Sequence, residues 1–121
     1  MKTTKGAFTL KTKYANNYCY LGIARYQQNN NLCLIAYDDM TEEEVMRLTV
    51  NPSVKLNDDC ICIKTYSENE GLAECLIKQG LIDQTPIHAF ESGFVLLPVY
   101  RLTAKGKALI TNVTERRGEA A

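Results

Sequence analysis

The side chains able to take part in covalent or metal chemistry are a single histidine, His88, and five cysteines. The cysteines are Cys19, Cys33, Cys60, Cys62 and Cys75. Each lies in an apolar stretch, where a buried thiol is inert, and their odd number favours reduced core thiols over a disulfide framework. Structural zinc would need further ligands at matching geometry. We therefore expect no Cys/His catalytic pair, no metal site and no other cofactor.

Carboxylates occur as adjacent pairs, at Asp38-Asp39 and at Asp58-Asp59. Adjacent acids usually flank a turn and cap the segment that follows it. Catalytic carboxylates must instead converge from several elements, and the sequence gives no sign of such convergence. We therefore predict that the chain is not an enzyme, and a small enzyme of unknown reaction is kept as an alternative.

The densest charge is the run DDMTEEE, which places five carboxylates in seven residues. These are Asp38, Asp39, Glu42, Glu43 and Glu44. One interpretation is a solvated turn, because most charge runs simply face water. The other is an acidic patch that docks on the basic groove of a protein partner. Such a patch can compete with nucleic acid, because the basic side chains that neutralise phosphates also attract carboxylates.

A second candidate surface combines lysines with tyrosines, at Lys11, Lys13, Tyr18 and Tyr20. Aromatic rings can stack on bases and lysines can neutralise phosphates, so this surface is an alternative site for single-stranded nucleic acid. Tyrosine is also an ordinary strand residue, and exposed lysines commonly guard a strand against edge pairing. The neutral net charge argues against a general nucleic-acid binder.

The candidate residues at the N-terminal end belong to a predicted hairpin. Residues 8–14 alternate between apolar and polar side chains, which is the period of a strand, and residues 18–26 form the second strand. Asn16-Asn17 then makes a two-residue turn. This register places Tyr14 opposite Cys19, and one side of the hairpin is apolar throughout.

The acidic run lies between two further predicted elements. Residues 32–37 are apolar on both faces, which is typical of a central strand. The segment 38–52 has two interpretations. Its TEEE sequence resembles a capping box and favours a short helix. The alternation over residues 44–50, together with Pro52, favours a turn at 38–43 followed by a strand.

The middle of the chain predicts a strand followed by a helix. Residues 60–66 alternate as a strand, and an amphipathic helix is expected over Ser67–Gln79, with its first residue or Asn69 as N-cap. Gly80 is the expected left-handed stop, and Leu81 follows as its apolar contact.

Residues 81–92 are expected to be irregular, and 94–102 to form a last strand, in which Pro98 argues for an edge position or a bulge. The predicted organisation is one domain, residues 1–103, followed by a polar C-terminal tail, residues 104–121. Together these elements predict an α+β fold, a mostly antiparallel sheet of five or six strands with one amphipathic helix packed on one face.

The 14 basic and 14 acidic residues cancel overall but are sorted along the chain. Residues 1–37 hold five bases and no acid, residues 38–91 hold twelve acids and four bases, and residues 92–121 hold five bases and two acids. Either these charges pair across strands, or they form separate surface patches.

No apolar run reaches a membrane span of ~18 residues, and no signal peptide is recognisable. We therefore expect a cytoplasmic protein.

Four short motifs can be compared with known families: Leu48-Thr49-Val50-Asn51, the strand near 60–66, Gly80-Leu81, and the segment 91–100 with sequence ESGFVLLPVY. Together they resemble a family of small uncharacterised proteins carried by conjugative elements and phages of gut bacteria. The resemblance covers roughly residues 18–102.

The chain departs from this pattern in its acidic run, where the family has a shorter turn, and in its C-terminal extension. The family has no established catalytic residues to transfer. The resemblance implies an accessory gene of a mobile element, and small proteins in that setting often antagonise host defences. The leading hypothesis is therefore a non-enzymatic binding protein that inhibits a host defence nucleoprotein complex, such as a CRISPR nuclease or a restriction enzyme.

Overall fold

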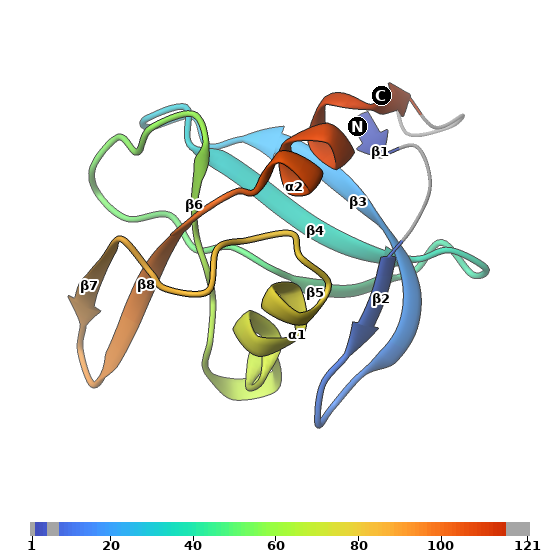
Figure 1. Ribbon diagram of the computed structural model, residues 1–121, viewed down its shortest axis with the longest axis horizontal. Coiled ribbons are helices and arrows are strands. Elements are labelled where there is room, and N and C mark those ends of the chain that lie inside the picture. The colour runs from blue at the N-terminus through green and yellow to red at the C-terminus, as the bar shows by residue number, and fades with distance from the viewer. Residues whose placement is uncertain (1, 5–7, 116–121) are drawn as a thin grey trace.

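The structure is a computed structural model that describes residues 2–4 and 8–115. Its strands pair antiparallel in a six-stranded and a three-stranded sheet, accompanied by two short helices, which confirms the α+β fold class (Figure 1). The strands are β1 (Lys2–Thr4), β2 (Phe8–Lys11), β3 (Asn16–Arg25), β4 (Leu32–Asp38), β5 (Glu44–Arg47), β6 (Cys60–Cys62), β7 (His88–Ser92), β8 (Val95–Arg101) and β9 (Val113–Glu115). The helices are the 3-10 turn η1 (Ser67–Asn69), α1 (Leu72–Lys78) and α2 (Ala104–Thr111).

The larger sheet has the order β5-β4-β3-β1-β9, and β2 also pairs with β3. Strand β3 is long enough to take two short strands along one edge, with Lys2 opposite Ile23 and Phe8 opposite Cys19. Strand β4 lies between β3 and β5 and is buried on both faces over its first five residues. The predicted central strand is therefore confirmed.

The smaller sheet, in the order β6-β8-β7, is joined to the larger one after β5. Thr49 forms a bridge with Ile63, and the Val50 N–H donates to the Cys62 carbonyl oxygen at 3.1 Å. Residues 44–50 are thus a strand and its extension, which confirms the turn-plus-strand interpretation over the helix.

The first hairpin forms with a different register from the predicted one. Cys19 lies opposite Phe8 rather than Tyr14, and the chain reverses over residues 12–15, which a backbone hydrogen bond of 2.8 Å closes. Asn16-Asn17 are the first residues of β3 and not the turn. The pairing is displaced by an even number of residues, so Leu10, Cys19 and Leu21 still face the core, whereas Tyr14 at the reversal does not.

Helix α1 begins later than expected, at Leu72 rather than Ser67. Gly71, with a φ of 87°, is its N-cap, and no side chain caps the helix. Asn69 does not act as the cap because its amide turns inward and donates to the Arg47 carbonyl oxygen at 2.6 Å. This bond gives the buried Asn69 amide a partner, as buried polar groups usually have.

The end of α1 is as predicted. Gly80 has a φ of 73° and its N–H donates to the Ile77 carbonyl oxygen at 2.9 Å. The Leu81 N–H donates to the Leu76 carbonyl oxygen at 3.0 Å, which completes the hydrogen-bond pattern of a Schellman motif. Leu81 is buried, as its role as the apolar contact requires.

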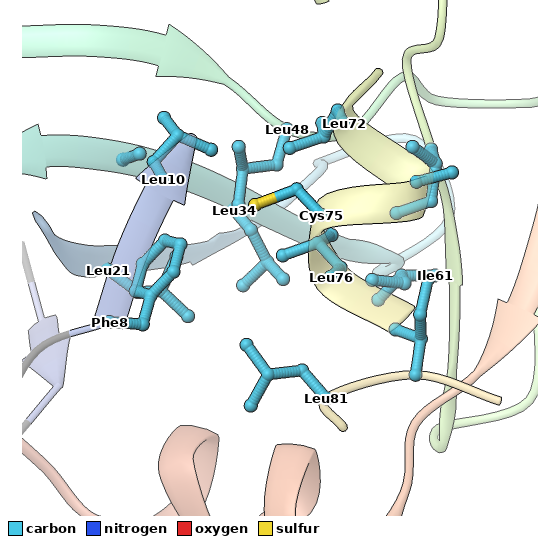
Figure 2. Packing of buried hydrophobic residues seen from close by; sticks show 14 of the residues in the cluster. Phe8, Leu10, Leu21, Leu34, Leu48, Ile61, Leu72, Cys75, Leu76 and Leu81 are labelled. Carbon is cyan, nitrogen blue, oxygen red and sulfur yellow. The ribbon is translucent and has the colours of Figure 1, made fainter. Parts of the chain in front are cut away.

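Helix α1 packs its buried face onto the main core, where side chains from β2, β3, β4 and the segment after β6 meet it (Figure 2). Figure 2 shows Leu72 and Leu76 of α1 with Phe8, Leu10 and Leu34 of the sheet. Cys60 and Cys62 lie in a second, smaller cluster, while Ile61 and Ile63 lie in the main one. All five cysteines are buried, which confirms their prediction as core thiols.

Part of the segment assigned to a polar tail is folded. Residues 104–111 form α2, and β9 pairs with β1 beyond it. The Thr103 hydroxyl caps α2 by accepting from the Gly106 N–H at 3.0 Å, and the Thr103 N–H donates to the Leu81 carbonyl oxygen at 3.1 Å. This anchoring depends on tertiary contacts that residue composition does not reveal. Residues 116–121 lie outside the described part.

The prediction that Pro98 marks an edge strand or a bulge is wrong, because β8 is the central strand of the smaller sheet. The Pro98 carbonyl oxygen accepts from the Ile63 N–H at 2.9 Å, just past the point where β6 ends at Cys62. In a strand the N–H and C=O of one residue point to the same side, so the N–H that Pro98 lacks would also point toward β6. Strand β6 ends at Cys62, and the pairing of β8 with β7 on the other side loses no hydrogen bond. The outer strand is β7, in a segment that the sequence predicted to be irregular.

The outer edge of β2 is covered by side chains of α1. The Gln79 Oε1 accepts from the Thr9 N–H at 3.0 Å, and the Gln79 Nε2 donates to the Thr9 carbonyl oxygen. The Cys75 sulfur lies 3.4 Å from the Lys11 backbone nitrogen and accepts from it. Gln79 therefore replaces a neighbouring strand and blocks pairing at this edge.

Gln79→Ala is expected to lower the free energy of unfolding by about 1 kcal/mol, because two hydrogen bonds to Thr9 are lost. Gln79→Glu should cost at least as much, since a carboxylate cannot donate to the Thr9 carbonyl oxygen. Urea unfolding measures both values, with the exposed Gln84→Ala as control. Equal stability of Gln79→Glu and the wild type would refute this role.

Candidate functional site

The acidic run forms the connection between β4 and β5, called here the acidic loop (residues 38–44). Asp38 organises it: its Oδ1 accepts from the backbone nitrogens of Met40 at 2.8 Å and Thr41 at 2.9 Å. Its Oδ2 accepts from the Asn17 side-chain amide at 2.8 Å. The bond to Asn17 and the two backbone bonds hold the Asp38 pKa below its usual value. Asp38 therefore holds the loop and is less available to a partner.

The other acids of the loop are presented around an apolar side chain. Asp39 is half-buried and its N–H donates to the Tyr18 carbonyl oxygen at 2.9 Å, whereas residues 42–44 are exposed. Met40 is 87% exposed, a large exposure for an apolar residue. Flexible methionine is common on protein-binding surfaces. The sequence analysis did not single out Met40, although it lies in the middle of the charge run.

Among the described residues, Glu43 and Glu44 of the acidic loop form no ion pair with the lysines of the first hairpin. Throughout the described part of the chain, no ion pair includes Glu43, Glu44, Lys11 or Lys13. The ion pairs present are Lys55–Asp58, Lys64–Glu68, Arg101–Asp59 and Lys107–Asp59. These contacts favour separate surface charges over cancellation across the strands.

The acidic loop should make stability depend on pH through Asp38. Its pKa is lower in the folded chain than in the unfolded chain, where it is about 4. The stabilisation is therefore present above that value and is lost as the pH falls through the folded pKa. Urea unfolding of wild type and Asp38→Asn should differ at neutral pH and converge in acid. A difference that stays constant with pH would contradict this role.

Only three of the four residues of the predicted lysine and tyrosine surface are exposed. Lys11, Lys13 and Tyr18 are exposed, but Tyr20 is fully buried and stacks on Tyr37 with ring centroids 5.4 Å apart. Tyr20 is therefore out of reach of a base. Tyr14, which the predicted register placed on the apolar face, is 57% exposed, with the Lys13 Nζ 5.5 Å from its ring centroid.

Lys11 also lines a hollow of about 270 Å³ between β2 and α1, together with Lys78 and Gln79. Two lysines from elements distant in sequence therefore border one surface depression. The helical spacing of α1 predicts that Lys78 is exposed. That it borders the same hollow as Lys11 depends on how α1 packs against β2, which the sequence does not show.

His88 is exposed and packs edge-to-face on Phe90, with ring centroids 4.5 Å apart. It borders a hollow of about 210 Å³ that Cys60 also lines. Burial, and then the neighbouring Asp59, raise the pKa of the Cys60 thiol, which donates to the Asp59 Oδ1 at 3.4 Å. The raised pKa favours the protonated thiol over the nucleophilic thiolate.

Other titratable groups near the candidate surfaces are buried thiols or carboxylates in ion pairs. Burial raises the pKa values of Cys19 and Cys62 to about 11. Asp59 pairs with Arg101 at 3.5 Å and with Lys107 at 3.9 Å. Asp58 and Asp59 thus serve as partners of basic side chains.

Within residues 2–4 and 8–115, no group of three or more histidine, cysteine or acidic side chains is arranged to hold a metal ion. In the same residues, no helix combines the length and apolar character needed to cross a membrane. Comparisons with family models, curated proteins and solved structures gave no match. The resemblance described from the sequence motifs therefore stays a prediction.

Proposed function

We propose that this chain is a non-enzymatic binding protein whose acidic loop docks on a basic groove of a protein partner. The observation that carries the proposal is the loop itself: Asp38 fixes its backbone, so the exposed Glu43, Glu44 and Met40 are held in place before binding. A pre-ordered loop loses less conformational entropy when it binds than a mobile one. Carboxylates around an apolar side chain suit a basic groove with an apolar floor.

Nucleic-acid-binding proteins have such grooves, because they neutralise phosphates with lysine and arginine. The motifs at 48–51 and 91–100 resemble proteins of mobile elements, which points to a host defence nucleoprotein complex as the partner. In this proposal the acidic loop occupies the groove that would hold DNA, and inhibition requires no catalysis.

The experiment uses purified DNA-binding defence complexes, both CRISPR interference complexes and restriction enzymes, loaded with fluorescently labelled target DNA. Fluorescence anisotropy reports displacement of the DNA as the intact chain is added. Wild type should displace DNA from at least one complex. Glu43→Lys combined with Glu44→Lys should weaken displacement by about tenfold or more, because like charges then meet in the groove.

The matched control is Glu70→Lys combined with Glu74→Lys, which changes net charge equally at exposed positions of the chain outside the acidic loop. This variant should displace DNA as wild type does. Absence of displacement by wild type from every complex would overturn the proposal, as would equal loss in both double variants.

A second candidate function is single-stranded nucleic-acid binding through the first hairpin. Lys11, Lys13, Tyr14 and Tyr18 are all exposed, which is the observation that favours it. Titration of a labelled oligonucleotide should give binding that weakens with salt. Lys11→Glu combined with Lys13→Glu should abolish this binding, and unchanged affinity would eliminate the candidate.

A further inference from the structure

The open edge of the smaller sheet is a different kind of surface from the acidic loop. Strand β7 is the outer strand of the order β6-β8-β7, and among the described residues it pairs only with β8. Figure 1 shows β7 at the far left of the molecule, while the acidic loop follows β4 near the other end of the long axis. Cys75 and Gln79 cover the edge of β2, but within residues 2–4 and 8–115 no side chain hydrogen-bonds to the outer edge of β7 in this way.

The direction of the Pro98 carbonyl group shows which backbone groups of β7 face outward. The Pro98 carbonyl oxygen points toward β6, where it accepts from the Ile63 N–H at 2.9 Å. Ala89 lies opposite Pro98, so these residues form a non-hydrogen-bonded pair, and the N–H and C=O of Ala89 point away from β8. The same alternation turns the N–H and C=O of Glu91 outward. Strand β7 therefore presents two donors and two acceptors at an open edge.

Apolar side chains accompany this edge. Ile87, just before β7, is 46% exposed, Leu96 is 59% exposed, and Phe94 at the hairpin turn is fully exposed. Phe90 is partly buried against the smaller core cluster, opposite Leu97 of β8. An unprotected strand with exposed apolar neighbours is a template for pairing with another strand.

We propose that β7 is a self-association surface, on which a second copy of this chain adds its own β7 antiparallel and joins the two small sheets into one. The register is centred on Phe90, so Ala89 of each copy lies opposite Glu91 of the other. This register turns the four outward groups of each copy into ladder hydrogen bonds. It places the two Phe90 rings across from each other, and aromatic cross-strand pairs are favourable.

The side chains of β7 suit this self-pairing. In the central register His88 faces Ser92 of the other copy, so no two charged side chains are directly opposed. Ile87 of one copy reaches the hairpin turn of the other at Gly93, which has no side chain to obstruct it. The two Glu91 carboxylates are diagonal neighbours, which limits the strength of the dimer and makes its affinity sensitive to charge at position 89.

Sedimentation velocity of the full chain over a broad range of concentrations tests the proposal. Wild type should show a monomer–dimer equilibrium. Ala89→Glu creates two directly opposed glutamate pairs and should weaken the dimer by about tenfold. Ala89→Lys creates two attractive pairs with Glu91 and should strengthen it by a similar factor. Both substitutions are at an exposed position, and thermal unfolding at low concentration verifies that the monomer folds equally well.

A disulfide experiment tests the register directly. Phe90→Cys in the presence of oxidised glutathione should give a covalent dimer, because directly opposed Cα atoms lie within disulfide reach. Ser92→Cys should give no disulfide-linked dimer, since Ser92 lies opposite His88 and the two introduced thiols are four residues apart along the ladder. A wild type that is monomeric at the highest concentration would overturn the proposal and leave the edge to a foreign strand. A dimer that responds equally to Ala89→Glu and Ala89→Lys would overturn it as well.

Discussion

Replacing Gly106 with alanine is expected to destabilise the fold by about 2 to 3 kcal/mol, although alanine is the better helix former. A Cβ on Gly106 would overlap with the Leu81 carbonyl oxygen and would lie 3.3 Å from Cδ2 of Leu102. The obstruction is backbone, so no side-chain rotation relieves it and α2 must move away from the end of α1. That movement also threatens the bond from the Thr103 N–H to the Leu81 carbonyl oxygen.

Urea unfolding of Gly106→Ala measures this cost, and Gly80→Ala is the comparison. Gly80 has a φ of 73° and its nearest neighbour to an added Cβ lies 4.0 Å away, so only backbone strain of about 1 kcal/mol is expected there. A Gly106→Ala variant as stable as wild type would show that α2 is not packed against Leu81.

Asn69→Asp is expected to lower stability by about 3 kcal/mol at neutral pH, because it buries an unpaired carboxylate. Asn69 is fully buried, its Nδ2 donates to the Arg47 carbonyl oxygen at 2.6 Å, and its Oδ1 has no hydrogen-bond partner among the described residues. An ionised aspartate has no donor, so its two oxygens would face the Arg47 carbonyl oxygen without a hydrogen bond. A protonated aspartate can donate to it as asparagine does.

The loss of stability in Asn69→Asp should therefore depend on pH. Burial raises the pKa of the introduced carboxyl in the folded state, so the variant is most stable in acid and loses stability as the pH rises through that pKa. Asn69→Ala removes the same hydrogen bond without adding a charge, and its cost should not vary with pH. Parallel pH profiles for the two variants would contradict this arrangement.

The elements set by local sequence could be predicted well. The stop of α1 at Gly80 needs a residue that tolerates positive φ, and the two faces of β6 follow from strict alternation at Cys60–Cys62. The strand at 44–50 was favoured by Pro52 and by β-branched residues. Each signal lies within a few residues of the feature that it predicts.

Features decided by tertiary contacts escaped prediction. The start of α1 depends on Asn69 reaching Arg47, far away in sequence, and Pro98 fits a central strand only because β6 ends beside it. Helix α2 has weak apolar patterning, and its place is fixed by Thr103 and by the close approach of Gly106 to Leu81. No local pattern carries this information.

The candidate site was predicted in composition but not in detail. The acidic residues 38–44 do lie together in one loop, yet Asp38 is engaged in holding the loop. Tyr20 was counted among surface aromatics but is buried and stacks on Tyr37. Exposure of one strand face depends on what packs over it, which alternation alone does not specify.

Site-specific photocrosslinking from position 40 tests most directly whether the acidic loop is the binding surface. Met40 is replaced by a photoreactive phenylalanine analogue in the full chain, and Val54, also exposed, is replaced in a control. Irradiation with the defence complex that loses its DNA should crosslink position 40 to a lysine- and arginine-rich segment of the partner, and excess oligonucleotide should suppress the crosslink. Crosslinks from position 54 alone, or crosslinks from position 40 that nucleic acid does not suppress, would contradict docking of the acidic loop in a nucleic-acid groove.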